Sequence, residues 1–476
     1  MTIEPNRPLF HFTPPINWMN DPNGLVWHNG EYHLYYQHNP YGKGWGHMSW
    51  GHAISADLLH WRHLPIALFE QPQRGYTIFS GSAVVDVRNT SGFGRDGCAP
   101  IVAVYTADYH PARPLEDIHI AYSLDDGRTF TEYAGNPVLR VHNPKFGDPK
   151  VFWHVPTERW IMVAIHGAEQ GWVDLYASPN LKDWTFLSAF HAPQAVPGMW
   201  ECPDLFPLVA PDGSERWVLK VNTVLPNQGG SITRYFVGYF DGWTFQADPA
   251  TPQMIYPDGD PIYAEVTYNN EPQGRRILLG WLRQTPREDR PWTGMQSIPR
   301  EVCLREIDGQ WRLCHRPAIE MQSLRRAHHV ATCFNLSGAG PAPNTPNSAH
   351  EVDRGGWEIA ARFDPGTADE CGIEVDLAHN AIARAGYSAA TGEVFIDAPG
   401  RPRSALPLRQ AGGPVDVHVF VDRGVIELFG GQGQVALSAL LEPETACLGL
   451  GVFAFDGVAR LAHLDMWRLE RVDGDV

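Results

Sequence analysis

Two short acidic motifs hold the residues best suited to chemistry: WMNDPNG at residues 18–24 and WECPD at residues 200–204. Each sets a carboxylate, Asp21 or Glu201, beside tryptophan and turn-forming residues. Cleavage of a sugar–sugar bond with retention needs two carboxyl groups about 5 to 5.5 Å apart, one ionised as nucleophile and one protonated as acid. Aromatic side chains provide walls for the sugar ring. The two motifs therefore favour a glycosidase.

The local sequence predicts a different role for each acid. Asn20 precedes Asp21, and Asn23 and Gly24 follow within three residues; their amides would hold a charged nucleophile. Glu201 lies between tryptophan and cysteine, and these less polar neighbours should keep a proton available for a general acid. A third acid, Asp148 in the sequence FGDPK at residues 146–150, could hold sugar hydroxyls. Taken singly, each motif is also typical of an ordinary turn or a solvated acid.

Length and composition limit the classes of protein to consider. At 476 residues the chain exceeds one core of ordinary size, so two domains are expected. The formal charge of −17 argues against nucleic acid or an anionic membrane as partner, because both attract a basic face. The 17 Trp, 46 Gly and 40 Pro indicate many short strands joined by tight turns, hence an all-β protein.

Neither a metal nor a cofactor is expected. The seven cysteines are scattered without a CxxC pair, and the 21 histidines show no HxxxH or HExxH spacing. The N-terminal residues lack the apolar core of a signal peptide, and no stretch approaches the roughly 18 apolar residues of a membrane span. As the sequence stands we expect a cytoplasmic protein, or a secreted one if a leader was removed. The oligomeric state is not readable.

A degenerate repeat indicates the architecture. A small or acidic turn followed by an aromatic residue recurs at residues 55–61, 123–130, 178–186 and 240–245, between strand-like segments. This spacing predicts a five-bladed β-propeller over residues 1–315. A polar, partly helical connector should follow at residues 316–329, and a β-sandwich domain at residues 330–476. Within the sandwich, residues 415–422 and 425–429 are predicted to form a hairpin.

Four motifs in chain order resemble those of the β-fructofuranosidases of glycoside hydrolase family 32: residues 18–24, FSGS at 79–82, GDPKVFW at 147–153 and ECPDLF at 201–206. The similarity covers nearly the whole chain. It implies a propeller whose central funnel holds the active site, followed by a β-sandwich. It also implies Asp21 as nucleophile, Glu201 as acid/base and Asp148 as transition-state stabiliser, without a metal. The fructose subsite would be lined by Asn20, Gln37, Trp45, Phe79, Ser80 and Trp281. Judged singly, Trp45 and Trp281 are more typical of core residues.

The chain departs from the family pattern beside the stabilising aspartate. The family usually has arginine there, and this sequence has Gly147, so a cationic fork that would hydrogen-bond the sugar is missing. Arg140, Lys145 and Lys150 are within chain reach and could substitute. Otherwise the subsite is altered and the preferred substrate unusual.

Asn222 and Thr223, followed by residues 229–238, are more similar to the exo-acting levanases and exo-inulinases than to plant invertases. The resemblance therefore implies release of terminal fructose from levan or inulin, with sucrose also accepted. A fructosyltransferase would use the same covalent intermediate. A fructan-binding protein without turnover is the alternative of another class, favoured by Gly147 and opposed by the intact acids.

Overall fold

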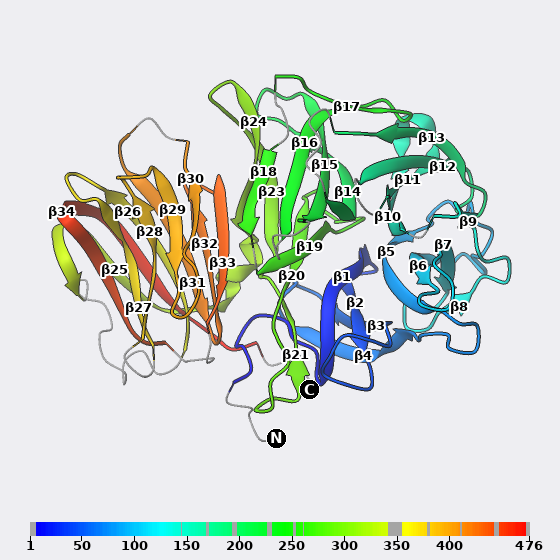
Figure 1. The fold of residues 1–476 in the computed structure, drawn as a ribbon, viewed down its shortest axis with the longest axis horizontal. Coiled ribbons are helices and arrows are strands. Elements are labelled where there is room, and N and C mark those ends of the chain that lie inside the picture. The colour runs from blue at the N-terminus through cyan, green and yellow to red at the C-terminus, as the bar shows by residue number, and fades with distance from the viewer. Residues whose placement is uncertain are drawn as a thin grey trace. The chain divides into compact units, whose positions relative to one another are not determined.

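The computed structural model describes residues 6–143, 145–167, 171–192, 198–225, 231–250, 254–259, 261–340, 355–377, 381–409, 412–441 and 447–472. In these residues every regular element is a strand, apart from the short 3-10 helices η1 (Val155–Thr157) and η2 (Ile319–Leu324) (Figure 1). The all-β prediction is confirmed. None of the described helices has the length and apolar character to cross a bilayer. Gly229 and Gly230 of the motif at residues 229–238 lie outside the described residues.

Five sheets follow one another along the chain and form a five-bladed β-propeller, as predicted. The first contains β1 (Asn17–His28), β2 (Glu31–Asn39), β3 (Ser49–Ser55), β4 (Trp61–Leu68) and β21 (Trp292–Thr293); the second β5 (Thr77–Val85), β6 (Ile101–Asp108), β7 (Glu116–Ser123), β8 (Thr131–Glu132) and β9 (Leu139–Arg140). The third contains β10 (Phe146–His154), β11 (Arg159–His166), β12 (Trp172–Ser178) and β13 (Thr185–Phe190).

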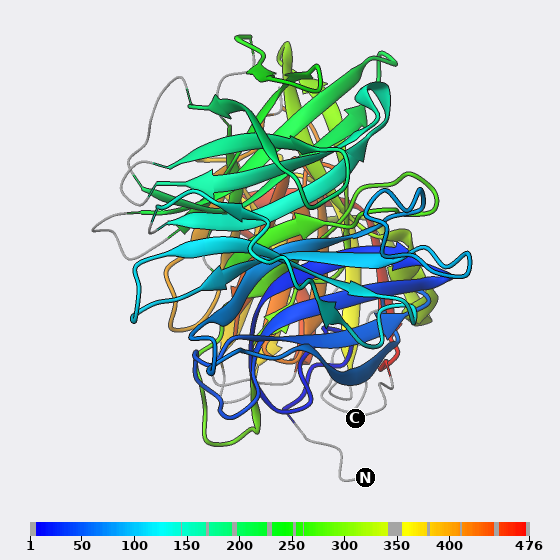
Figure 2. The ribbon, with the colours of Figure 1, turned by 90° about the vertical axis from the view of Figure 1, so that its right-hand side faces the viewer.

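The fourth sheet contains β14 (Met199–Val209), β15 (Glu215–Val224), β16 (Ser231–Phe240), β17 (Phe245–Ala247) and β18 (Met254–Gly259). The fifth contains β19 (Ile262–Thr267), β20 (Ile277–Leu282), β22 (Met295–Gln296), β23 (Arg300–Ile307) and β24 (Gln310–Pro317). Figure 2 shows the first four blades passing in chain order from the blue strands to the green ones.

The repeat seen in the sequence is the turn between the third and fourth strands of four blades. It joins β3 to β4, β7 to β8, β12 to β13 and β16 to β17. In each turn an Asp or Asn oxygen accepts backbone N–H groups two to four residues later: Asp57 from Leu59 and His60, Asp125 from Thr129, Asn180 from Lys182 and Asp183, and Asp241 from Trp243 and Thr244. These side chains satisfy turn amides that no strand partner reaches, which explains why acidic and amide residues recur there.

In every blade, the pairing between the first strand and its neighbour is irregular. In Figure 1, β1, β5, β10, β14 and β19 lie on the inner side of the propeller. The pairing register of each with its neighbour shifts, after Met19, Ile78, Gly147, Glu201 and Tyr263 respectively. Such bulges break the alternation of side chains and re-aim them. The five register shifts therefore turn the side chains that follow them toward the centre of the propeller.

Two compact units can be distinguished. One holds Thr13–Tyr256 and Ile262–Pro299, and the other holds Arg300–Asp473 together with Met1–Phe12 and Pro257–Pro261. The domain boundaries expected from the sequence, 1–315, 316–329 and 330–476, stay predictions.

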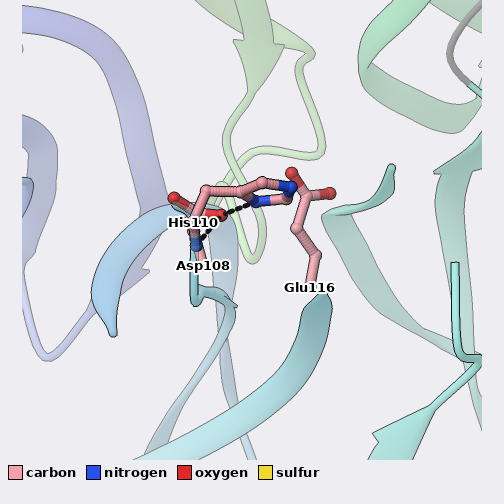
Figure 3. A group of neighbouring side chains, drawn as sticks. All are labelled: Asp108, His110 and Glu116. Atoms are coloured by element: carbon pink, nitrogen blue, oxygen red, sulfur yellow. Dashed lines mark hydrogen bonds and ion pairs between the residues drawn. The ribbon is translucent and has the colours of Figure 1, made fainter. Parts of the chain in front are cut away.

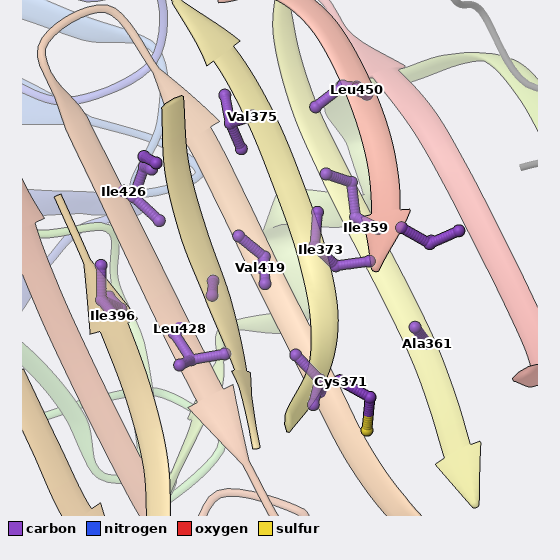
Figure 4. Packing of buried hydrophobic residues seen from close by; sticks show 14 of the residues in the cluster. Ile359, Ala361, Cys371, Ile373, Val375, Ile396, Val419, Ile426, Leu428 and Leu450 are labelled. Atoms are coloured by element: carbon purple, nitrogen blue, oxygen red, sulfur yellow. The ribbon is translucent and has the colours of Figure 1, made fainter. Parts of the chain in front are cut away.

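The C-terminal strands form a β-sandwich. They are β25 (Arg325–Gly340), β26 (Gly356–Asp364), β27 (Glu370–Leu377), β28 (Ile382–Ser388), β29 (Glu393–Asp397), β30 (Ser404–Pro407), β31 (Val415–Asp422), β32 (Val425–Gly430), β33 (Val435–Leu440) and β34 (Cys447–Leu469). The long β34 pairs with β27 through its first half and with β26 through its second, so one strand joins both layers. Buried side chains from the two layers, such as Ile373 and Val419, meet between them (Figure 4). The predicted hairpin is β31 and β32.

A buried ion network ties the N-terminal segment to this unit. His11 Nδ1 lies 2.8 Å from Asp422 Oδ2, and its Nε2 lies 2.9 Å from Glu427 Oε1, with all three side chains fully buried. Arg300 donates from Nε to Glu427 at 3.1 Å, and Asp422 also accepts the backbone N–H of Leu9 at 2.8 Å. Burial opposes the charge of His11, but the two carboxylates outweigh it and raise its pKa to about 9.

We expect His11→Ala to lower the free energy of unfolding of this unit by about 3 to 5 kcal/mol, because two buried carboxylates lose their shared partner. The ordinary histidine pKa is 6.5 and the folded value about 9, so the stabilisation is complete below pH 6.5 and lost as pH rises through about 9. Thermal unfolding of both proteins at about pH 6 and about pH 9.5 measures this. The exposed His328→Ala variant is the control. An equal difference between wild type and His11→Ala at both pH values would contradict the prediction.

Candidate active site

The structure brings the three predicted acids together at the inner bulges. Asp21 lies on β1, Asp148 on β10 and Glu201 on β14, whose next residue is Cys202. The Cys202 thiol lies 3.7 Å from Asp21 Oδ2 and 3.8 Å from Asp148 Oδ2, so both carboxylates flank one sulfur. The Cys202 N–H donates to Asp148 Oδ2 at 2.9 Å. Asp148 and Cys202 have φ of 51° and 48°, a left-handed conformation that is uncommon for such residues and is held here by the bulges.

Asp21 is half-buried and is held by two hydrogen bonds. Ser80 Oγ donates to its Oδ2 at 2.6 Å and Asn20 Nδ2 to its Oδ1 at 3.1 Å. Burial raises the pKa of Asp21 to about 6; the Ser80 bond opposes this rise, and the charges of Asp148 and Glu201 add to it. The Asn20 amide donates to this acid as predicted, but the neighbouring amides do not set its pKa alone. Desolvation and two further acids outweigh the hydrogen bonds.

We expect Ser80→Ala to lower kcat/KM about 10-fold or more, since a hydrogen bond to a charged group contributes about 1.5 to 3 kcal/mol. In the wild type, activity should fall as pH drops through about 6, where Asp21 becomes protonated. Loss of the serine hydroxyl should raise the pKa of Asp21 further and move this acid limb to higher pH. Fructose release measured across pH tests this, with Ser188→Ala on the outer strand β13 as control. An unmoved acid limb would refute the role given to Ser80.

The pKa of Asp148 depends on the charged groups around it. Burial raises its pKa; the Lys145 ammonium lowers it, and the Glu201 charge raises it. Its backbone N–H donates to Thr106 Oγ1 at 2.8 Å, which fixes the bulge that carries it. The Glu201 charge thus makes Asp148 harder to ionise, and Lys145 offsets part of this repulsion.

Glu201 has polar partners at both carboxyl oxygens. The Tyr263 hydroxyl donates to Oε2 at 2.5 Å, and Lys145 Nζ lies 3.3 Å from Oε1. The less polar surroundings predicted from the sequence are therefore wrong. Trp200 belongs to an apolar cluster of the propeller, and the Cys202 thiol contacts the two aspartates instead.

Of the predicted subsite residues, Asn20 and Ser80 contact Asp21 directly. Asn20 is itself fixed, because its Oδ1 accepts from Trp18 Nε1 at 2.7 Å and its carbonyl from Gln296 Nε2 at 2.9 Å. Trp281 meets the Trp18 ring edge-on, with centroids 5.7 Å apart. Trp281 also packs on the small cluster that contains Tyr263 and Cys202. It therefore belongs to the neighbourhood of the acids.

The other three predicted residues lie beside this group. Gln37 is buried, and its Nε2 donates to the Ile78 carbonyl at 3.0 Å, next to Phe79 on β5. Trp45 is 63% exposed, so it is no core residue, and its ring centroid lies 6.0 Å from that of Phe79. In the described part of the chain, no hydrogen bond joins Trp45 or Phe79 to the acids.

The sequence motifs gave no site role to Tyr263, Thr106 or Glu116. Tyr263 stands in the sequence PIYA at residues 261–264. Lys145 was one of three candidate cations, and the structure separates them: Arg140 pairs with Asp117 at 2.6 Å and Lys150 with Asp204 at 3.5 Å. Of the three, Lys145 is the cation that pairs with Glu201.

One group of side chains has the composition of a metal site. Asp108, His110 and Glu116 have ligand atoms within 4.8 Å of one another (Figure 3). His110 Nδ1 already hydrogen-bonds Asp108 Oδ1 at 2.5 Å. Glu116 accepts the Phe146 N–H at 2.8 Å and faces the Lys145 ammonium at 3.8 Å. A cation beside an ammonium group is disfavoured, so we assign these residues to hydrogen bonding.

Sequence comparison relates the chain to enzymes that act on fructans. Residues 11–317 match the N-terminal domain of glycosyl hydrolases family 32, and residues 320–468 match the C-terminal domain of that family. The chain is 38% identical to a levanase of Bacillus subtilis (strain 168), over 99% of this chain and 71% of the relative. It is 35% identical to the extracellular exo-inulinase of Aspergillus awamori, over 98% of this chain and 95% of the relative.

Solved structures show the same fold. The exo-inulinase of Aspergillus awamori superimposes with a TM-score of 0.89 at 33% identity, over 99% of this chain and 100% of that one. The fructofuranosidase of Schwanniomyces occidentalis, solved with fructose, gives a TM-score of 0.86 at 28% identity, over 99% of each chain. Together with the two domain matches and the acids gathered at the inner bulges, these similarities show that the chain belongs to glycosyl hydrolase family 32.

Proposed function

We propose that this glycosidase releases terminal fructose from levan-type or inulin-type fructans and also accepts sucrose. The observation that carries the proposal is that Asp21 on β1 and Glu201 on β14 lie close enough for the Glu201 charge to raise the pKa of Asp21, with Asp148 beside the same Cys202 thiol as Asp21. Support for an exo-acting enzyme comes from the similarity to an exo-inulinase over nearly the full length of both chains. The levanase similarity covers as much of this chain.

The proposed reaction has two steps. Glu201 donates its proton to the glycosidic oxygen while an Asp21 oxygen bonds to the anomeric carbon C2, so the leaving alcohol departs and a fructosyl ester remains. Glu201 then takes a proton from water, whose oxygen attacks C2, and Asp21 leaves as a carboxylate with fructose free. Asp148 holds ring hydroxyls most tightly as the oxocarbenium-like state forms.

The proposed fructose subsite follows from the neighbourhood of Asp21. Its polar members are Asn20, Ser80 and Gln37, and its aromatic members are Trp45, Phe79 and Trp281. An amide and a hydroxyl beside the nucleophile can bind sugar hydroxyls, and tryptophan rings can pack on the apolar face of a sugar. No step of the reaction requires a metal or cofactor. We propose no nucleic-acid or membrane partner, in keeping with the net charge of −17.

The test is a time course of products from sucrose, levan and inulin, separated by chromatography. Fructose as the first and main product supports the proposal. Short oligosaccharides at early times would indicate internal cleavage, and products longer than the substrate would indicate fructosyl transfer. Binding of levan without any released sugar would overturn the proposal in favour of a binding protein.

A further inference from the structure

Gly147 is required by its neighbour across the sheet. A Cβ at position 147 would lie 2.6 Å from Thr106 Oγ1 and 2.8 Å from Thr106 Cγ2. Thr106 is buried, and its branched side chain has little rotational freedom to move aside. A side chain at 147, arginine included, therefore does not fit while Thr106 stays in place.

Thr106 occupies that space with a double hydrogen bond. Its Oγ1 accepts the Asp148 N–H at 2.8 Å and donates to the Ser80 carbonyl at 3.1 Å. Ser80 in turn donates to Asp21 at 2.6 Å. One threonine hydroxyl thus connects the strand of the proposed stabiliser to the strand that supports the proposed nucleophile.

The cation beside Glu201 is Lys145, two residues before Gly147 in the chain. The Lys145 ammonium lies 3.3 Å from Glu201 Oε1 and 3.8 Å from Glu116 Oε1, with its side chain 17% exposed. Burial opposes its charge, but the carboxylates of Glu201, Glu116 and Asp148 outweigh burial and raise the pKa of Lys145. It therefore carries its charge at every pH at which the enzyme would work.

Both ends of this contact are fixed. Glu116 accepts the Phe146 N–H at 2.8 Å with one oxygen and faces the Lys145 ammonium with the other, which orients the lysine. On the other side, Tyr263 holds the second oxygen of Glu201 at 2.5 Å. The Glu201 carboxyl thus lies between a cation from the bend before β10 and a hydroxyl from β19.

We propose that Lys145 is the positioning residue of Glu201, and that it supplies from position 145 the cation that Thr106 excludes from position 147. The inference rests on the proposed function, because it assigns Lys145 to the general acid of that reaction. Lys145 orients the carboxyl toward the leaving oxygen and balances its charge once the proton has left. Glu116 keeps the lysine in place.

The test compares Lys145→Met, Lys145→Arg and Glu116→Gln with wild type, on sucrose and on fructosyl fluoride. Loss of a positioned acid should lower kcat of Lys145→Met on sucrose about 10- to 100-fold, with KM changed less than about 3-fold. Fluoride leaves without a proton, so kcat/KM on fructosyl fluoride, which reports the first step alone, should fall much less than kcat/KM on sucrose. Lys145→Arg should recover part of kcat, and Glu116→Gln should show a weaker form of the same defect.

Lys182→Met, whose ammonium bonds the Ser91 carbonyl away from the acids, is the matched control and should behave as wild type. Thermal unfolding shows whether each variant is folded. If Lys145→Met does not fold, Glu116→Gln tests the same contact. A kcat of Lys145→Met on sucrose within about 2-fold of wild type, or equal losses of kcat/KM on both substrates, would overturn the inference. In either case the wild type still releases fructose. If the proposed function itself is wrong, the wild type releases none.

Discussion

Asp21→Ala should abolish fructose release, with kcat lowered by at least about 10⁴-fold, because a covalent route without its nucleophile retains only binding and acid catalysis. Sucrose and levan should still bind, since the subsite side chains other than Asp21 are unchanged. Initial rates on both substrates and binding by calorimetry measure the two effects. Asp212→Ala, in an exposed turn, is the control. Activity of Asp21→Ala within about 100-fold of wild type would contradict the assignment.

Glu201→Ala should separate the two steps of the reaction. On sucrose, loss of the general acid should lower kcat about 10²- to 10⁴-fold. On fructosyl fluoride the first step needs no proton donor, so the variant should form the fructosyl ester rapidly and hydrolyse it slowly. Stopped-flow release of fluoride should then show a burst equal to the enzyme concentration, followed by slow turnover.

Azide should accelerate the second step of Glu201→Ala, because it attacks the ester without a general base. Glu158→Ala, exposed on the turn after η1, is the control and should show neither burst nor azide effect. Equal losses of kcat/KM on sucrose and fructosyl fluoride would show that Glu201 is not the proton donor, because kcat/KM reports the first step alone.

The blades could be predicted because their signal is local. An Asp or Asn that caps a tight turn and an aromatic residue that starts the next strand are both written within a few residues, as in Asp57 and Trp61. The hairpin of β31 and β32 was visible for the same reason, since alternation and a glycine turn need no distant partner.

The surroundings of the acids could not be predicted, because they depend on register between strands and on other blades. The sequence next to Glu201 shows tryptophan and cysteine, yet its partners are Lys145, just before β10, and Tyr263 on β19. The bulge after Glu201 turns Cys202 toward Asp21 and Asp148 instead. A register shift is a property of two paired strands, so one strand alone does not reveal it.

The pKa of Asp21 illustrates the same limit. Neighbouring asparagines suggested an acid held in its charged form, and burial and two further carboxyl groups raise its pKa to about 6. The Ser80 bond, which comes from the next blade, counters this rise more than the Asn20 bond does.

The most direct measurement is mass spectrometry of Glu201→Ala after brief incubation with fructosyl fluoride and digestion in acid. If Asp21 attacks the anomeric carbon, one peptide should gain the mass of a single anhydrofructosyl unit, and fragmentation should place it on Asp21. An adduct on any other residue, or none despite a fluoride burst, would contradict the assignment of Asp21 and Glu201.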